Sequence, residues 1–249
     1  MTRDTPAAAL ETASAEDLRK LMSSVRYALW DFDGPICRLF AGLAASQVAR
    51  EFIDLLKEGK QDEQLDLLPM TERLSKDPHA MLVTVARRHP NSDRIVKLEE
   101  WLTGREIAAA HSAFRTPHAK EVIQAWGNLG VQLAVSTNNS ARAAARYLAA
   151  EGLDCFFPHI YGRTHDLSLM KPHPHTLLLA LDAMGADPSE TLMLGDASTD
   201  YTAAQAADVP FLAYADTFHK VEEFHQKGVE PSRIVRSLKD VRDVLSSQN

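Results

Sequence analysis

The chain has 249 residues, 45% of them hydrophobic and 24% charged, a composition that is ordinary for a globular protein and excludes a disordered or fibrous chain. Lys and Arg total 27 against 34 Asp and Glu, and the net charge of -7 excludes a basic field that would attract nucleic acid without specificity. Two cysteines, no secretory-type leader and no apolar run of membrane-spanning length lead us to expect a cytoplasmic protein without a membrane partner.

The start of the chain predicts one short helix and one strand. Residues 1–13 are expected to be loose, and Ser14 followed by Asp17 predicts a capped helix. Residues 27–32 form an apolar run that predicts a strand. The Asp-Gly-Pro sequence at 33–35 ends this strand, because glycine and proline disfavour both regular structures.

Residues 38–115 predict an all-helical insert. Apolar residues recur there at helical spacing, and no strand signal separates the helical segments. Charged and proline-containing breaks divide the insert into segments at 39–56, 79–88 and 93–114.

After Pro117 helices and strands alternate along the chain. This alternation predicts crossover units and a parallel sheet flanked by helices, so the fold class is α/β, with residues 1–37 and 116–249 in the sheet-bearing core. Ligands of such sheets lie beyond the carboxyl ends of the strands. The predicted helices are 118–130, 140–152, 174–185 and 199–209, and the predicted strands are 131–136, 159–162, 191–195 and 211–214.

Polar side chains follow three of the predicted strands and could meet at one edge of the sheet. A carboxylate there can take a phosphoryl group and so divide a hydrolysis into two easier displacements, while a second carboxyl group moves the proton. Two carboxylates would repel a phosphate, so the site needs a hard cation with oxygen ligands, for which magnesium is suited. The candidates are Asp31 and Asp33, then Ser136, Thr137 and Asn138, then Asp196 and Asp200, with Lys171 in a loop between the last two groups.

These residues, in this order, resemble the four motifs of the haloacid dehalogenase-like hydrolase superfamily. The matching segments are D-x-D-G from Asp31, S-T-N from Ser136, K-P from Lys171 and G-D-x-x-x-D from Gly195. The resemblance covers roughly residues 25 to 34 and 117 to 215. Pro35 departs from the pattern, because the family commonly has threonine there, and this puts the geometry of the following turn in question.

The resemblance implies a Rossmann-like core and an aspartyl-phosphate mechanism. Asp31 would be the nucleophile and Asp33 the acid and base, and Mg²⁺ would be held by Asp31, the Asp33 carbonyl and Asp196, with Asp200 as a further metal candidate. Gly34, Thr137, Asn138 and Lys171 are the corresponding phosphoryl-binding candidates. The helical insert at 38–115 looks like the family's C1 cap, which closes over the site and helps to select the substrate.

The resemblance favours a phosphatase that acts on a small phosphorylated metabolite, since dehalogenases and phosphonate hydrolases of the superfamily usually lack an equivalent of Asp33. A phosphoglucomutase-like phosphoryl transferase and a non-catalytic protein with the same fold remain alternatives. The sequence leaves open whether Ser136 or Thr137 supplies the hydroxyl of the second motif. Asp200 could instead begin the following helix, where the helix dipole favours a carboxylate. The substrate's identity and the oligomeric state are not readable from the sequence.

Overall fold

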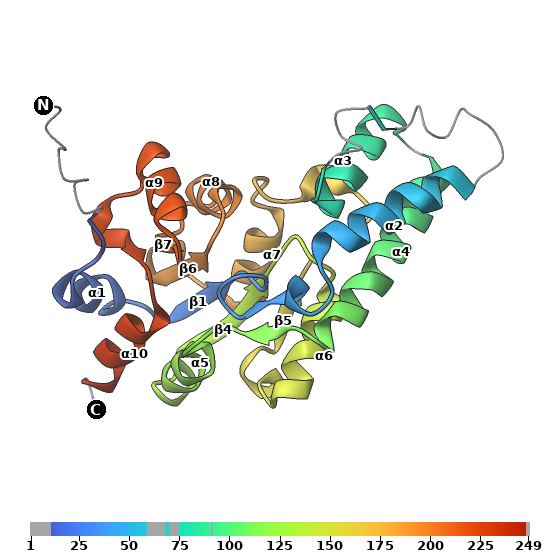
Figure 1. The fold of residues 1–249 in the computed structure, drawn as a ribbon. Coiled ribbons are helices and arrows are strands. Elements are labelled where there is room, and N and C mark those ends of the chain that lie inside the picture. The colour runs from blue at the N-terminus through green and yellow to red at the C-terminus, as the bar shows by residue number, and fades with distance from the viewer. Residues whose placement is uncertain (1–10, 59–67, 70–74, 91, 248–249) are drawn as a thin grey trace, which may run out of the picture.

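The computed structural model describes residues 11–58, 68–69, 75–90 and 92–247 (Figure 1). The expectation of a loose N-terminus concerns residues 1–13, of which 1–10 lie outside the described part. Helix α1 (Ala15–Met22) begins as predicted with a capping box, in which Asp17 N donates to Ser14 Oγ and Ser14 N donates to the Asp17 carboxylate. No helix among the described residues is long and apolar enough to cross a membrane.

The centre of the molecule is a parallel sheet of six strands in the order β5-β4-β1-β6-β7-β8. The predicted α/β fold class is thus confirmed. β1 is two residues shorter than predicted and ends at Trp30, and β8 lies outside the segments for which the sequence predicts an element. The strands are β1 (Tyr27–Trp30), β4 (Gln132–Ser136), β5 (His159–Tyr161), β6 (Thr191–Gly195), β7 (Phe211–Tyr214) and β8 (Ile234–Val235).

Helices cover both faces of the sheet. Side chains of a strand alternate between its two faces, so neighbouring residues of β1 pack against different helices. Ala28 and Trp30 of β1 pack with α1, α5, α6 and α10, whereas Leu29 between them packs with α7, α8 and α9. Both faces of β1 are therefore buried, as its apolar sequence requires. The helices are α5 (Ala119–Asn128), α6 (Ala141–Glu151), α7 (His175–Met184), α8 (Ser198–Ala206), α9 (Phe218–Gln226) and α10 (Leu238–Ser246).

Among the described residues, three helices form a separate layer beside the sheet, on the side away from α1 and from the C-terminal helix (Figure 1). They are α2 (Ala45–Glu58), α3 (Pro78–Arg88) and α4 (Asp93–Ala110), and we call them the cap. The cap has its own apolar core, which includes Phe52, Met81 and Leu102. The chain enters and leaves the cap through two short antiparallel strands, β2 (Cys37–Arg38) and β3 (Phe114–Arg115). The proposed boundaries of the insert, at 38 and 115, fall within this strand pair.

Candidate active site

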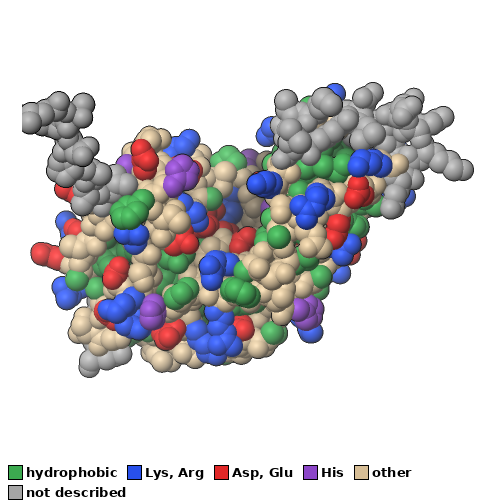
Figure 2. Space-filling model, in the orientation of Figure 1, with side chains coloured by type: hydrophobic (Ala, Val, Ile, Leu, Met, Phe, Trp, Pro, Cys, Tyr) green, Lys and Arg blue, Asp and Glu red, His purple; other side chains and the backbone are tan. Residues whose placement is uncertain are grey.

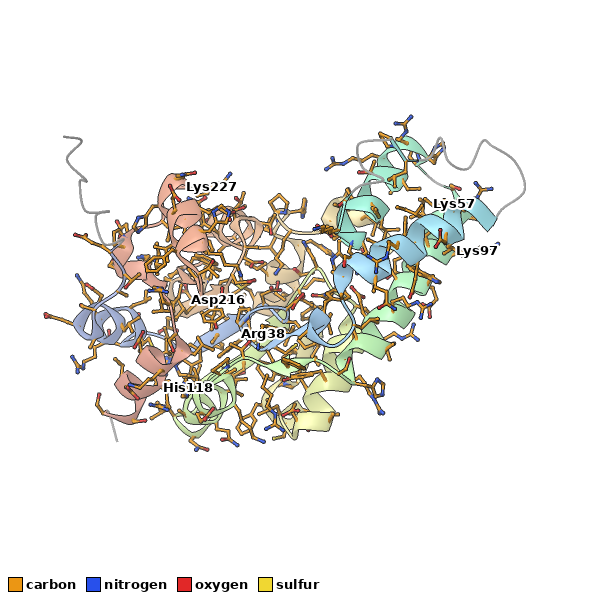
Figure 3. All side chains as sticks on the ribbon, viewed as in Figure 1. Arg38, Lys57, Lys97, His118, Asp216 and Lys227 are labelled. Carbon is orange, nitrogen blue, oxygen red and sulfur yellow. The ribbon has the colours of Figure 1, made fainter. Side chains whose placement is uncertain are left out.

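A cavity of about 680 Å³ lies where β1, β4 and β6 end, between the sheet and the cap. Figure 2 shows the surface hollowed between these two parts, with charged side chains around the hollow. Arg38 and Asp216, both labelled in Figure 3, line it from β2 and from the segment after β7. All the predicted site residues except Ser136 and Thr137 also line it: Asp31, Asp33, Gly34, Asn138, Lys171, Asp196 and Asp200.

The turn after β1 brings two carboxylates to the mouth of the sheet. Asp31 is buried, and its backbone N–H donates to Leu194 O at 2.9 Å, which continues the pairing with β6. The Asp33 carboxylate instead accepts from the backbone N–H of Leu39 at 2.8 Å. Gly34 has a φ of +117°, and a Cβ there would lie 2.2 Å from Asp196 Cγ, so only glycine fits. Pro35 is buried in the same turn, where the chain folds back to Cys37.

Lys171 is buried, although its residue still lines the cavity. Its ammonium group contacts Asp31 Oδ1 at 2.9 Å and Asp200 Oδ1 at 2.5 Å and donates to Ser136 O at 2.8 Å. Asn138 fixes the lysine backbone from both sides, since its Nδ2 donates to Lys171 O at 2.9 Å and its Oδ1 accepts from Lys171 N at 2.7 Å. The side-chain amide of Asn138 therefore holds the lysine in place.

The two candidate hydroxyls after β4 have different partners. Ser136 Oγ lies 2.8 Å from Thr176 Oγ1 of α7, inside the core. Thr137 is also buried, and its hydroxyl lies 3.1 Å from Asn139 Oδ1 and accepts from Asn139 N at 3.2 Å. The hydroxyl of Thr137 thus shapes a loop whose next two residues, Asn138 and Asn139, line the cavity.

The turn between β6 and α8 supplies the remaining carboxylates. Asp200 Oδ2 accepts from the backbone N–H groups of Asp196 and Ala197, each at 3.1 Å, while Oδ1 contacts Lys171. Both of its oxygens are therefore engaged within the protein. Asp196 forms an ion pair with Lys220 of α9, a residue that the sequence pattern does not single out.

Burial and neighbouring charges shift the pKa values of Asp31, Asp33, Asp196 and Lys171. Burial raises the pKa of Asp31 and of Asp196, against the lowering effects of Lys171 and Lys220 respectively. Burial also raises the pKa of Asp33 to about 6. For Lys171 burial acts to lower the pKa, but the nearby carboxylates outweigh it and raise the pKa.

The cluster fits a divalent cation by its donors and its charge. Asp31, Asp196 and Asp200 each offer an oxygen, and these oxygens lie within 4.8 Å of one another. Among the described residues that line the cavity, six are aspartates, against two lysines and one arginine. Oxygen donors with excess negative charge are the environment that magnesium prefers.

The chain matches the family model described as haloacid dehalogenase-like hydrolase over residues 25–208. The chain belongs to this family. Among the relatives of this haloacid dehalogenase-like hydrolase, Pyrophosphatase PpaX of Oceanobacillus iheyensis is 27% identical over 63% of the chain and 76% of the relative. Phosphoglycolate phosphatase of Escherichia coli is 30% identical over 55% of the chain and 53% of the relative, so the match spans about half of that protein.

Solved structures show the same fold at low sequence identity. A predicted phosphatase from Clostridium acetobutylicum superposes with a TM-score of 0.65 at 15% identity, covering 90% of this chain and 99% of the other. CbbY from Rhodobacter sphaeroides, in complex with phosphate, gives a TM-score of 0.61 at 19% identity, covering 86% and 94%. The recognition of the superfamily from the sequence is thus confirmed.

In this haloacid dehalogenase-like hydrolase, the cap contributes residues that the sequence analysis missed. His79 and Asp77 line the cavity from the start of α3. Behind them Glu106 and Arg163 form a buried ion pair between α4 and the loop after β5. The helical spacing of α4 predicts a packed helix but cannot show which buried position holds a charge, because the partner lies 57 residues away.

Proposed function

We propose that the protein is a magnesium-dependent phosphohydrolase that cleaves a small-molecule phosphate monoester through an aspartyl-phosphate on Asp31. The observation that carries this proposal is the setting of the Asp31 carboxylate. It lies at the end of the central strand, in contact with the Lys171 ammonium group and within reach of the oxygens of Asp196 and Asp200. A carboxylate in this position can approach a phosphoryl group, because the neighbouring Lys171 ammonium group would balance part of the negative charge.

The reaction proceeds in two displacements. A carboxylate oxygen of Asp31 attacks phosphorus, and the bond between phosphorus and the leaving oxygen breaks while Asp33 donates its proton to that oxygen. Water then attacks the phosphoryl group of the aspartyl-phosphate, Asp33 takes a proton from the water, and inorganic phosphate leaves with Asp31 restored. A pKa of about 6 suits Asp33 for both proton transfers near neutral pH.

The remaining residues bind and orient the phosphoryl group. Lys171 would neutralise one of its oxygens, and Asp200 holds Lys171 and the turn after β6 in position. Asp31, the Asp33 carbonyl and Asp196 would hold the magnesium ion, with Asp200 beside them. When bound, the ion supplies positive charge for the phosphoryl oxygens.

Gly34, Thr137 and Asn138 shape the phosphoryl-binding end of the site. Gly34 lets the turn after β1 pass close to Asp196, and Asn138 fixes the backbone of Lys171. The hydroxyl of Thr137 would bind a phosphoryl oxygen.

The cap would exclude water from the cavity, which strengthens the electrostatic interactions inside it. Both cysteines are free thiols, which supports a cytoplasmic location.

Phosphate release from a panel of sugar phosphates, nucleotides and phosphoglycolate, with Mg²⁺ or with EDTA, tests the function. We expect release that depends on Mg²⁺ and that is lost in Asp31→Asn, whose circular dichroism spectrum should match that of the wild type. Full activity in this variant would refute the nucleophile. Formation of an isomeric sugar phosphate without release of phosphate would favour the phosphoryl-transferase alternative instead.

A further inference from the structure

The inner side of the cap holds a buried ionic cluster that the proposed reaction does not use. Its centre is Glu106 of α4, whose side chain is completely buried. Arg163 donates from Nη1 to Glu106 Oε1 at 2.9 Å and from Nη2 to Oε2 at 3.0 Å. Asn139 Nδ2 donates to the same carboxylate at 3.2 Å and Ser140 N at 3.0 Å. One carboxylate of the cap is thus bonded to the loops after both β4 and β5.

His79 is held by this cluster at the wall of the cavity. Its Nε2 lies 2.6 Å from Glu106 Oε1, and its ring packs edge-on against Phe40 with 6.4 Å between the centroids. Its backbone N–H donates to Asp77 Oδ1 at 2.8 Å, which anchors the start of α3. The side chain is 20% exposed and lines the cavity. The orientation of the ring is therefore fixed before any ligand arrives.

The other ring nitrogen of His79 is available to a ligand. Nδ1 makes no hydrogen bond within the described part of the chain, since its contact with Asp77 Oδ1 is 3.9 Å long. Burial would raise the pKa of Glu106, but Arg163 and His79 lower it to about 2, so this carboxylate is ionised and can only accept. Nε2 therefore carries a hydrogen. Nδ1 accepts a hydrogen bond when the ring is neutral and donates one when the ring is charged.

The position of His79 relative to the reacting groups indicates what Nδ1 would meet. The phosphoryl end of the cavity is occupied by Asp31 and Lys171. Asp33 and His79 line the same cavity, Asp33 from the turn after β1 and His79 from the start of α3. In the proposed reaction Asp33 protonates the leaving oxygen. A cap residue that lines the same cavity can therefore contact the leaving group.

We propose that His79 is a specificity residue whose Nδ1 binds a polar substituent of the leaving group, and that Glu106 is a positioning residue that orients the ring. This inference rests on the proposed phosphohydrolase function. The favoured substrate is a phosphate monoester whose leaving group carries a hydroxyl or a carboxylate near the ester oxygen. A hydroxyl donates to the neutral ring, and a carboxylate accepts from the charged ring.

The test compares kcat/KM for ribose 5-phosphate, phosphoglycolate and phenyl phosphate, each with Mg²⁺, in the wild type and in His79→Ala. Phenyl phosphate has no polar substituent on its leaving group and serves as the reference. The polar ester with the higher kcat/KM identifies the substituent as hydroxyl or carboxylate. We expect the ratio of that ester to phenyl phosphate to fall about tenfold in His79→Ala, mainly through KM, as for a hydrogen bond worth about 1.4 kcal/mol.

A matched control and two amide variants sharpen this test. His89→Ala changes a histidine at the other end of α3, outside the cavity, and should leave the ratio unchanged. In His79→Asn the amide can reach the place of Nδ1, and in His79→Gln the place of Nε2. We expect His79→Asn to retain more of the ratio. The inference is overturned if the His79→Ala ratio stays within twofold of the wild type or if the wild type prefers phenyl phosphate to both polar esters.

Glu106→Gln tests positioning, in the wild type and in the His79→Ala background. If Glu106 acts through the ring, the substitution lowers the ratio in the wild type and leaves it unchanged in the second background. A further fall there would refute the positioning role and assign Glu106 a general structural one. If the wild type releases no phosphate from these three esters or from the panel above, the proposed function fails and the inference with it. Active enzyme with unchanged ratios overturns the inference alone.

Discussion

Lowering the pH should weaken the attachment of the cap to the sheet-bearing part, because it protonates the Glu106 carboxylate that joins them. Arg163, His79, Asn139 and Ser140 all contact this carboxylate. Burial acts to raise the pKa of Glu106, but Arg163 and His79 prevail and lower it from 4.5 to about 2. The perturbation that isolates its titration is Glu106→Gln, which keeps the shape of the side chain and removes the charge.

The depressed pKa fixes both the sign and the size of the effect. The ionised form of Glu106 stabilises the folded state fully above the unfolded-state pKa, and this stability is lost as the pH falls through the folded-state pKa. A difference of about 2.5 pH units corresponds to about 3 kcal/mol at pH 6. At pH 3.5 about 2 kcal/mol of it remains, since the unfolded chain already binds a proton there.

Urea unfolding of both chains at pH 6 and pH 3.5 measures the effect. At pH 6 the variant should be less stable, because Arg163 is buried and, within the described part of the chain, keeps only Glu99 as an ionic partner. At pH 3.5 the difference in the free energy of unfolding between the two chains should be smaller by about 1 kcal/mol. An equal difference at both pH values would refute the reasoning. Glu100→Gln, which removes one member of an exposed ion pair with Arg142, is the control and should show little change.

Three further substitutions test the phosphoryl-binding end of the cavity. Gly34→Ala should abolish phosphate release and weaken Mg²⁺ binding in calorimetry, since the added Cβ would lie 2.2 Å from Asp196 Cγ; release within tenfold of the wild type would contradict this. Thr137→Val should raise KM for phenyl phosphate about tenfold, whereas Ser136→Ala should leave KM nearly unchanged. The Ser136 hydroxyl is paired with Thr176 inside the core, whereas Thr137 belongs to the loop whose next two residues line the cavity. The opposite order in steady-state kinetics would assign the phosphoryl contact to Ser136.

The sequence by itself determined the α/β architecture and the edge of the sheet where the site forms. Period-two and period-3.6 patterns predict β1 and the alternation of helices and strands from α5 to β7, and parallel strands bring their carboxyl ends to one edge. They do not predict the short strands β2 and β3 at the two ends of the insert, which was expected to be all-helical. Asp31, Asp196 and Lys171 could therefore be expected together, although 140 residues separate Asp31 from Lys171. The C-terminal elements α9, β8 and α10 lacked so clear a pattern.

Only the tertiary structure decided which polar residues outside the motifs reach the site. Lys220 meets Asp196 because α9 packs beside β7 and returns its start to the cavity. Glu106 and His79 belong to helices whose apolar spacing predicts packing, and nothing in that spacing distinguishes a buried charge from a solvated one. The end of a strand is encoded by neighbouring residues and can be recognised locally in the sequence. An ion pair between distant segments forms only when the cap packs against the sheet-bearing part, so its partners cannot be recognised from either segment alone.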